Sequence, residues 1–87
     1  MRVIFTEKAM SQYIAWQSED KKTLKRINAL IQSIQRDGFM NGIGKPEALK
    51  GRKEYSRRID DSNRLVYIGD SEQNLVVFSC KGHYDDK

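Results

Sequence analysis

Four short blocks in the second half of the chain carry the side chains that could do chemistry, at residues 44–50, 55–59, 63–67 and 82–84. Together they hold a carboxylate, several cations, one imidazole and a phenol. RNA cleavage without a metal uses these groups: a base takes the proton of the ribose 2′-OH, the alkoxide attacks the adjacent phosphate, and an acid protonates the departing 5′ oxygen. Cations stabilise the charged transition state, and an aromatic ring can stack on an unpaired base.

Several of these side chains also have a purely structural explanation. His83 is the only histidine and lies near the end of the chain, where an exposed imidazole is usually inert. Glu47 lies in a loop rich in glycine, where a solvated carboxylate is common. Trp16 lies on an apolar helical stripe and Cys80 inside an apolar strand, so we expect both in the core rather than in a site.

The adjacent residues Arg57 and Arg58 must point to opposite faces of a strand. A three-residue hairpin loop over residues 61–63 places Asp60 opposite Arg64 and puts Arg58 on the face of Arg64. A two-residue loop instead makes Arg57 the companion of Arg64, and the pattern of residues leaves both registers open. We expect one of the two arginines to pair with an acid such as Glu54 or Asp60, or to cover a sheet edge.

The elements that must position these residues alternate between helical and extended patterns. The spacing of apolar residues predicts two helices, one beginning after Thr6 and one after Ser18 or Asp20 and ending at Gly38. It predicts a loop over residues 39–53 and strands over residues 3–5, 55–59, 64–68 and 75–80. Helices followed by strands indicate an α+β fold, with a two-helix hairpin on one face of an antiparallel sheet. The other face is then available for a site.

Length and composition limit the function classes further. The 87 residues allow a single domain, residues 1–87. No apolar run is long enough for a membrane helix or a signal peptide, so we expect a cytoplasmic protein. The single cysteine cannot form an internal disulfide, and the histidine, cysteine and carboxylates have no zinc-site spacing. The net charge of +4 favours a polyanion such as RNA or DNA, or an acidic protein, although a solvated surface also explains it.

The blocks together resemble a known family. GKPE at 44–47, SRRI at 56–59, RLVY at 64–67 and HY at 83–84, with the helical segments 15–17 and 25–31, resemble the signature of the YoeB/Txe toxins in the RelE superfamily. The resemblance covers residues 1–84. It implies a RelE-like, microbial-ribonuclease-type fold and a toxin of a type II toxin–antitoxin system. It further implies a metal-independent endoribonuclease, without cofactor, that cleaves mRNA in the ribosomal A site and so inhibits translation.

The resemblance also implies a role for each matching residue. Glu47 would be the general base and His83 the general acid. Arg64 would stabilise the transition-state phosphate. The remaining implied site residues, two that bind phosphate and one that supports the scissile nucleotide, are Lys50, Arg58 and Tyr84. The motif match favours Arg58 over Arg57 as the neighbour of Arg64.

The implied partners are mRNA on the ribosome, a YefM/Axe-like antitoxin, operator DNA bound only as the toxin–antitoxin complex, and a second copy of the chain. We expect the antitoxin to be acidic, partly disordered until bound, and able to displace residues 83–84 from the basic face. The chain departs from the family pattern in a short 51–55 segment and in residues 85–87, whose two carboxylates we expect to raise the pKa of His83.

Two other functions use the same cations. A module that binds ribosomes or nucleic acid and blocks without cleaving, acting with its antitoxin as a co-repressor, has no need of His83. A structural protein with a basic face needs only an acidic partner. Mapping of new 5′ ends on a translated message separates cleavage from both alternatives.

Overall fold

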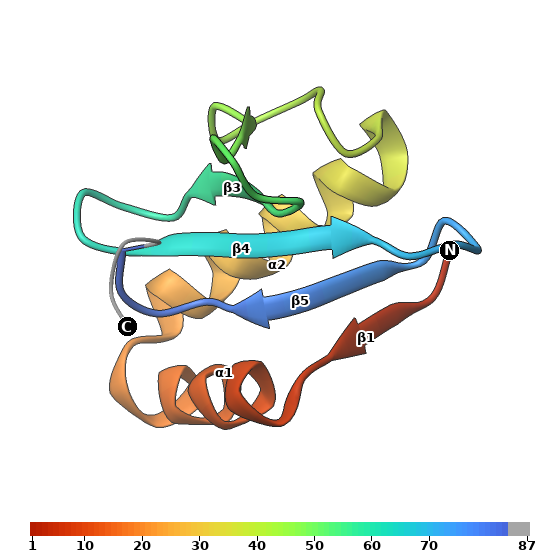
Figure 1. The fold of residues 1–87 in the computed structure, drawn as a ribbon. Helices are drawn as coiled ribbons and strands as arrows, with labels where there is room; N and C mark the ends of the chain where they lie inside the picture. The colour runs from red at the N-terminus through yellow and green to blue at the C-terminus, as the bar shows by residue number, and fades with distance from the viewer. Residues whose placement is uncertain (84–87) are drawn as a thin grey trace.

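The computed structural model describes residues 1–83, in which two helices lie against one five-stranded sheet (Figure 1). The elements in chain order are β1 (Val3–Phe5), α1 (Glu7–Glu19), α2 (Lys21–Asp37), β2 (Glu47–Ala48), β3 (Tyr55–Arg58), β4 (Arg64–Gly69) and β5 (Leu75–Ser79). The predicted α+β fold class is confirmed, and every predicted helix and strand is present. The strand β2 is an addition, since the sequence predicts only a loop there.

Side-chain caps set the beginning of both helices. The Thr6 hydroxyl accepts a hydrogen bond from the Ala9 N–H at 3.1 Å, and the Asp20 carboxylate accepts from two backbone N–H groups in the first turn of α2. Asp20 is also the C-cap of α1, so one residue makes the tight break between the helices. Gly38 ends α2 with a φ of +97°. Neither helix within residues 1–83 has the length and apolar surface that a bilayer crossing requires.

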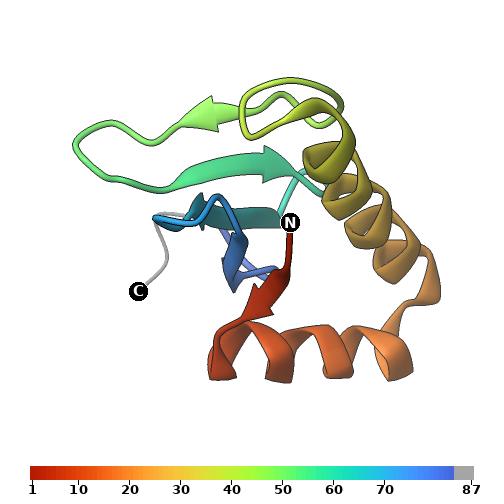
Figure 2. The ribbon, with the colours of Figure 1, turned by 90° about the vertical axis from the view of Figure 1, so that its right-hand side faces the viewer.

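The sheet has the strand order β1-β5-β4-β3-β2. Strands β3 to β5 pair antiparallel, as predicted, and β2 pairs antiparallel with β3, but β1 pairs in parallel with β5, with Val3 opposite Leu75. The sheet is therefore mixed at one edge. Two helices separate β1 from the later strands, so no hairpin turn dictates its direction. Figure 2 shows the two helices meeting at an open angle around the sheet.

The core lies between the helices and the sheet, and both residues expected there are confirmed. Trp16 is 8% exposed, and its indole N–H donates to the Cys80 carbonyl at 2.9 Å. Cys80 is fully buried, and burial raises the pKa of its thiol to about 11. The other core residues shared between helices and sheet include Ala9, Ile27, Leu30, Ile34, Leu65, Tyr67, Leu75 and Val77.

Arg57 is the largest fully buried side chain of the described chain, on the helix side of β3. Its guanidinium donates to oxygens of Tyr67 (2.9 Å), Ser33 (3.1 Å), Gly38 (2.9 Å), Phe39 (3.4 Å), Asn41 (2.6 Å) and Ile43 (2.9 Å). Four of these acceptors are backbone carbonyls of residues 38–43, a segment that belongs to no helix or strand. The buried charge therefore supplies the hydrogen bonds that secondary structure supplies elsewhere.

One expected alternative is that one of the two adjacent arginines pairs with an acid such as Glu54 or Asp60, and Arg57 does not do so: Glu54 pairs with Arg52. The Asp60 carboxylate instead accepts hydrogen bonds from Ser62 and Asn63 in its own turn. Loop carbonyls, and not a carboxylate, accept the hydrogen bonds of Arg57, because neutral oxygens can also satisfy the five N–H donors of a guanidinium.

The first prediction concerns the cap of α2. Hydrogen bonds from the side chain and then the backbone of Thr23 hold the pKa of Asp20 below its ordinary value of 3.8. Since the folded-state pKa is the lower one, the Asp20 carboxylate stabilises the fold above about pH 4 and loses this effect as the pH falls through the folded-state pKa. Asp20→Ser keeps a capping oxygen that does not titrate. We expect urea unfolding to show a smaller loss of stability between pH 5 and pH 2.5 in Asp20→Ser than in the wild type. Parallel pH profiles would contradict the assigned cap.

The second prediction compares two adjacent arginines. Arg57→Met removes the Arg57 donor from the carbonyls of Gly38, Asn41 and Ile43, while the Phe39 carbonyl keeps the Tyr67 hydroxyl, so we expect the free energy of unfolding to fall by about 3 kcal/mol or more. Arg58→Met changes an exposed side chain of the same type, and we expect a change within about 0.5 kcal/mol. Chemical denaturation of both variants measures the difference. Equal stability of the two variants would show that the buried guanidinium is dispensable.

Candidate active site

The face of the sheet that turns away from the helices carries Ser56 and Arg58 on β3 and Arg64 on β4. Side chains alternate along a strand, so the burial of Arg57 and Leu65 on the helix side turns these three residues outward. In the strand register Arg58 lies directly opposite Arg64. The structure has neither of the two registers that the sequence leaves open, but its register also puts Arg58 on the face of Arg64.

The turn between β3 and β4 is wider than either predicted loop. The Ile59 N–H donates to the Asn63 carbonyl at 3.0 Å. The Asp60 carboxylate accepts from the backbone N–H groups of Ser62 and Asn63, both at 2.8 Å. Asp60 therefore does not lie opposite Arg64, as the three-residue loop would place it, because its carboxylate binds inside the turn.

Two residues in the left-handed backbone region precede β2, Gly44 with φ +86° and Lys45 with φ +51°. A Cβ at position 44 would lie 2.6 Å from a leucine side chain of α2, so glycine is required there. The Arg58 N–H donates to the Gly44 carbonyl at 2.7 Å and ties this bend to the end of β3. Glu47 then lies directly opposite Ser56 and shares its outward face.

The segment after β5 reaches the same face through backbone hydrogen bonds. The Gly82 carbonyl accepts from the Arg64 N–H at 2.9 Å, and the Gly82 N–H donates to Asn63 Oδ1 at 2.7 Å. Arg64 Nη1 donates to the carbonyls of Asp60 at 2.6 Å and Asn63 at 3.1 Å. His83 follows Gly82 in the chain and so comes next to Arg64.

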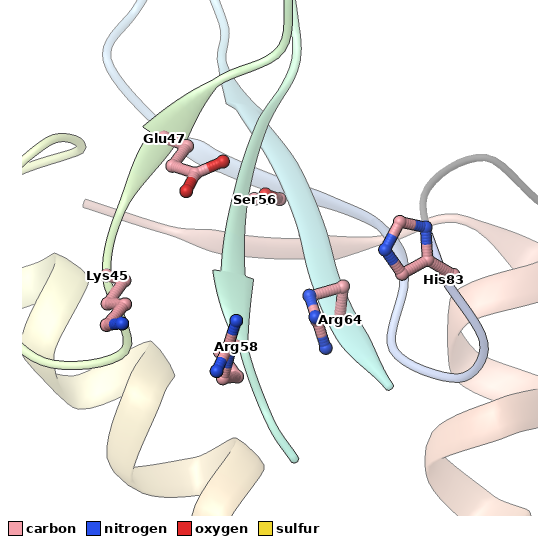
Figure 3. Close-up of a pocket in the computed structure, with 6 residues that line it drawn as sticks. All are labelled: Lys45, Glu47, Ser56, Arg58, Arg64 and His83. Atoms are coloured by element: carbon pink, nitrogen blue, oxygen red, sulfur yellow. The ribbon is translucent and has the colours of Figure 1, made fainter. Parts of the chain in front are cut away.

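A pocket of about 240 Å³ lies on this outward face. Its lining residues are Lys45, Glu47, Ser56, Arg58, Arg64 and His83 (Figure 3). Glu47 from β2 and His83 from the segment after β5 (residues 80–83, the tail) lie on two sides of the pocket, with strands β3 and β4 between them. Lys45 and Arg58 lie at the end of the pocket nearest α2. The structure therefore brings together four of the six residues to which the family motifs give a role.

This arrangement joins a carboxylate and an imidazole across a row of cations. Glu47 can accept a proton and His83 can donate one, while the guanidinium groups of Arg58 and Arg64 can bind the oxygens of a phosphodiester placed between them. The positive charge is in place before any substrate arrives, as stabilisation of a phosphorane-like transition state needs. Within residues 1–83, no three histidine, cysteine, aspartate or glutamate side chains come together as a metal site.

The pocket and the predicted set of site residues differ in four places. Lys45 and Ser56 line the pocket although the motifs give them no role. Lys45 reaches the pocket because its backbone is left-handed, a conformation that a lysine in a sequence does not predict. Lys50 lies exposed in the turn after β2 and does not line the pocket, so its phosphate-binding role stays a prediction. Tyr84 and the two carboxylates of residues 85–87 lie outside the described residues.

A family model and several named proteins match almost the whole chain in sequence. The model of a family described as "YoeB-like toxin of bacterial type II toxin-antitoxin system" matches residues 5–84. A protein named Toxin YoeB from Synechocystis is 48% identical over 86 residues, which cover 97% of this chain and 98% of that protein. Toxin YoeB from Escherichia coli K12 is 40% identical over 86 residues, which cover 97% of this chain and all of that protein.

Solved structures agree with the sequence matches. A YoeB–YefM toxin–antitoxin heterotetramer from Staphylococcus aureus contains a chain with a TM-score of 0.88 and 44% identity, over 97% of this chain and 98% of that one. A YoeB dimer from the same organism gives a TM-score of 0.89 with 44% identity over the same shares. YafQ from E. coli strain BL21(DE3), at 14% identity and a TM-score of 0.68 over 95% of this chain and 94% of that one, shares the fold alone. The chain therefore belongs to the YoeB family of toxins of bacterial type II toxin–antitoxin systems.

Proposed function

We propose that this toxin is a ribosome-dependent endoribonuclease that cleaves mRNA in the ribosomal A site and thereby inhibits translation. The observation that carries the proposal is the outward pocket, in which Glu47 and His83 flank Arg58 and Arg64. A proton acceptor, a proton donor and fixed cations around one phosphate-sized space are the groups that cleavage by 2′-OH attack needs.

In the proposed reaction Glu47 takes the proton of the ribose 2′-OH. The 2′ oxygen then forms a bond to the adjacent phosphorus while the bond to the 5′ oxygen breaks. His83 gives its proton to that leaving oxygen. The products are a 2′,3′-cyclic phosphate, which water can open to a 3′-phosphate, and a free 5′-OH. Arg64 stabilises the charge on the phosphate oxygens in the transition state.

The other site residues bind and orient the RNA. Arg58 binds phosphate beside Arg64, Lys50 binds phosphate outside the pocket, and Tyr84 supports the scissile nucleotide. Lys45 adds a third cation at the pocket, next to Arg58. These contacts recognise the phosphate backbone and not the base sequence.

The composition of the pocket supports dependence on the ribosome. Among the described lining residues, His83 is the one with a ring that could stack on a base; the others are charged or small and polar. Such a pocket holds phosphates but positions bases weakly, since base stacking on aromatic rings supplies much of the affinity for single strands. A message already held in the decoding site arrives with its nucleotides positioned.

We also infer the partners from the same surface and from the relatives. A YefM/Axe-like antitoxin neutralises the toxin, as the YoeB–YefM complex of S. aureus suggests. An acidic, partly disordered antitoxin segment would cover the cationic face and displace residues 83–84. The toxin binds operator DNA only within that complex, and it forms a homodimer like that of the S. aureus relative.

The third prediction tests the acid and the base. Glu47→Gln and His83→Gln each remove one proton transfer, so we expect the rate of mRNA cleavage on programmed ribosomes to fall by roughly 10²- to 10⁴-fold. Primer extension measures the rate, and direct labelling of the new ends by polynucleotide kinase shows whether they carry a 5′-OH. Glu72→Gln removes an exposed carboxylate between β4 and β5 that does not line the pocket, so this variant is the matched control and retains wild-type cleavage. Full cleavage by both pocket variants would overturn the assignment, and a wild type that yields no new 5′ ends would identify a blocker instead of a nuclease.

The fourth prediction concerns Lys45 as a phosphate contact. In an inactive His83→Gln background, we expect Lys45→Gln to weaken binding to programmed ribosomes and to reduce the slope of log K against log[salt] by roughly 0.7, the value for one single-strand phosphate contact. Lys53→Gln removes an exposed lysine between β2 and β3 that does not line the pocket, and it serves as control. Indistinguishable slopes for the two variants would place Lys45 outside the RNA interface.

A further inference from the structure

We propose that Asn63 is a positioning residue for the reaction, because its side chain fixes the backbone that presents His83 beside Arg64. The inference rests on the proposed function, in which these two groups act on one phosphate. None of the family motifs quoted above assigns Asn63 a role. The argument starts from the hydrogen bonds of the β3–β4 turn.

The tail is held at Gly82 from both sides. Its N–H donates to Asn63 Oδ1 at 2.7 Å, a contact between residues 19 positions apart in the sequence. Its carbonyl accepts from the Arg64 N–H at 2.9 Å. Gly82 also has a φ of +84°, so the chain turns there in a conformation that glycine adopts readily. The residue before the imidazole is thus clamped between the side chain of Asn63 and the backbone of Arg64.

Asp60 holds the amide of Asn63 in the required orientation. Asn63 Nδ2 donates to both carboxylate oxygens of Asp60, at 3.0 and 3.1 Å. Burial alone would raise the pKa of Asp60, but hydrogen bonds from Asn63 and Ser62 outweigh it and keep the pKa below its ordinary value. An ionised carboxylate accepts only, so the amide must turn its NH₂ towards Asp60 and its oxygen towards Gly82.

The same turn also holds the guanidinium of Arg64. Arg64 Nη1 donates to the carbonyl oxygens of Asp60 at 2.6 Å and of Asn63 at 3.1 Å. One four-residue turn therefore sets both the transition-state cation and the backbone of the general acid. If the Asn63–Gly82 hydrogen bond is lost, Gly82 keeps the hydrogen bond that its carbonyl accepts from the Arg64 N–H.

The experiment measures the kinetics of mRNA cleavage by the Asn63→Ala variant on programmed ribosomes. We expect kcat for cleavage to fall about tenfold to 100-fold, since a misplacement of about 1 Å is enough for the larger effect. KM should change less than twofold, because the cations that bind phosphate stay in place. Ser62→Ala, in the same turn, keeps its backbone donor to Asp60 and is the matched control.

A charge-neutral exchange provides the rescue. Asn63→Asp alone places a second carboxylate against Asp60 and should lower kcat. The double variant Asp60→Asn/Asn63→Asp exchanges donor and acceptor, restores one amide–carboxylate pair and keeps an oxygen facing Gly82, so we expect it to recover most of kcat. Recovery by the double variant would show that the pair of residues 60 and 63 is required as a unit, and amide exchange at Gly82 then separates positioning from overall stability.

Amide hydrogen exchange at Gly82 gives a readout that does not depend on catalysis. We expect exchange of the Gly82 N–H to speed up at least tenfold in Asn63→Ala and to stay at the wild-type rate in Ser62→Ala. Unchanged exchange, or wild-type kcat in Asn63→Ala, would overturn the positioning role. If the wild type itself does not cleave RNA, the proposed function fails, while the exchange data still test whether Asn63 holds the tail.

Discussion

Arg57 carries a full positive charge into the core of an 87-residue protein, and the transfer of such a charge out of water is costly unless hydrogen bonds replace its hydration. Six oxygens surround the guanidinium, and four of them are carbonyls of residues 38–43. These carbonyls have no helix or strand to satisfy them. The charge and the irregular loop therefore depend on each other. Because this loop leads directly into the bend at Gly44 and into β2, the wall of the pocket that carries Glu47 depends on a residue on the opposite face of the sheet.

The two walls of the pocket are anchored separately. The β2 wall is tied to the sheet by the bond from the Arg58 N–H to Gly44, and from beneath by Arg57. The tail wall is tied to the β3–β4 turn through Gly82. Strands β3 and β4 lie between the walls and supply the paired arginines. Strands β3 and β4 thus carry the paired arginines, while the two groups proposed to transfer protons come from the short strand β2 and from the segment after β5. Specific hydrogen bonds hold both of these segments, an arrangement that favours precise positioning.

The amino-acid sequence predicts the elements well, because their signals are local. Thr6, Asp20 and Gly38 mark helix ends through interactions with residues three or four positions away. Features that depend on contacts between distant segments are harder to predict. The parallel partner of β1 and the two-residue β2 have no local pattern, and the width of the β3–β4 turn decides whether Arg57 or Arg58 faces outward. The family motifs name Glu47, Arg58, Arg64 and His83 at the pocket, yet the bend that brings Lys45 there and the contact between Asn63 and Gly82 become visible only in three dimensions.

The attachment of the tail has a consequence for how this toxin can be switched off. The imidazole reaches the pocket through Gly82, which is bound by two hydrogen bonds, each contributing about 1 kcal/mol net. Breaking these two hydrogen bonds costs about 2 kcal/mol, while the core with Trp16 and Arg57 keeps its contacts. A ligand that captures the released end could therefore hold the protein in a folded but inactive state, from which activity returns as soon as the ligand is degraded.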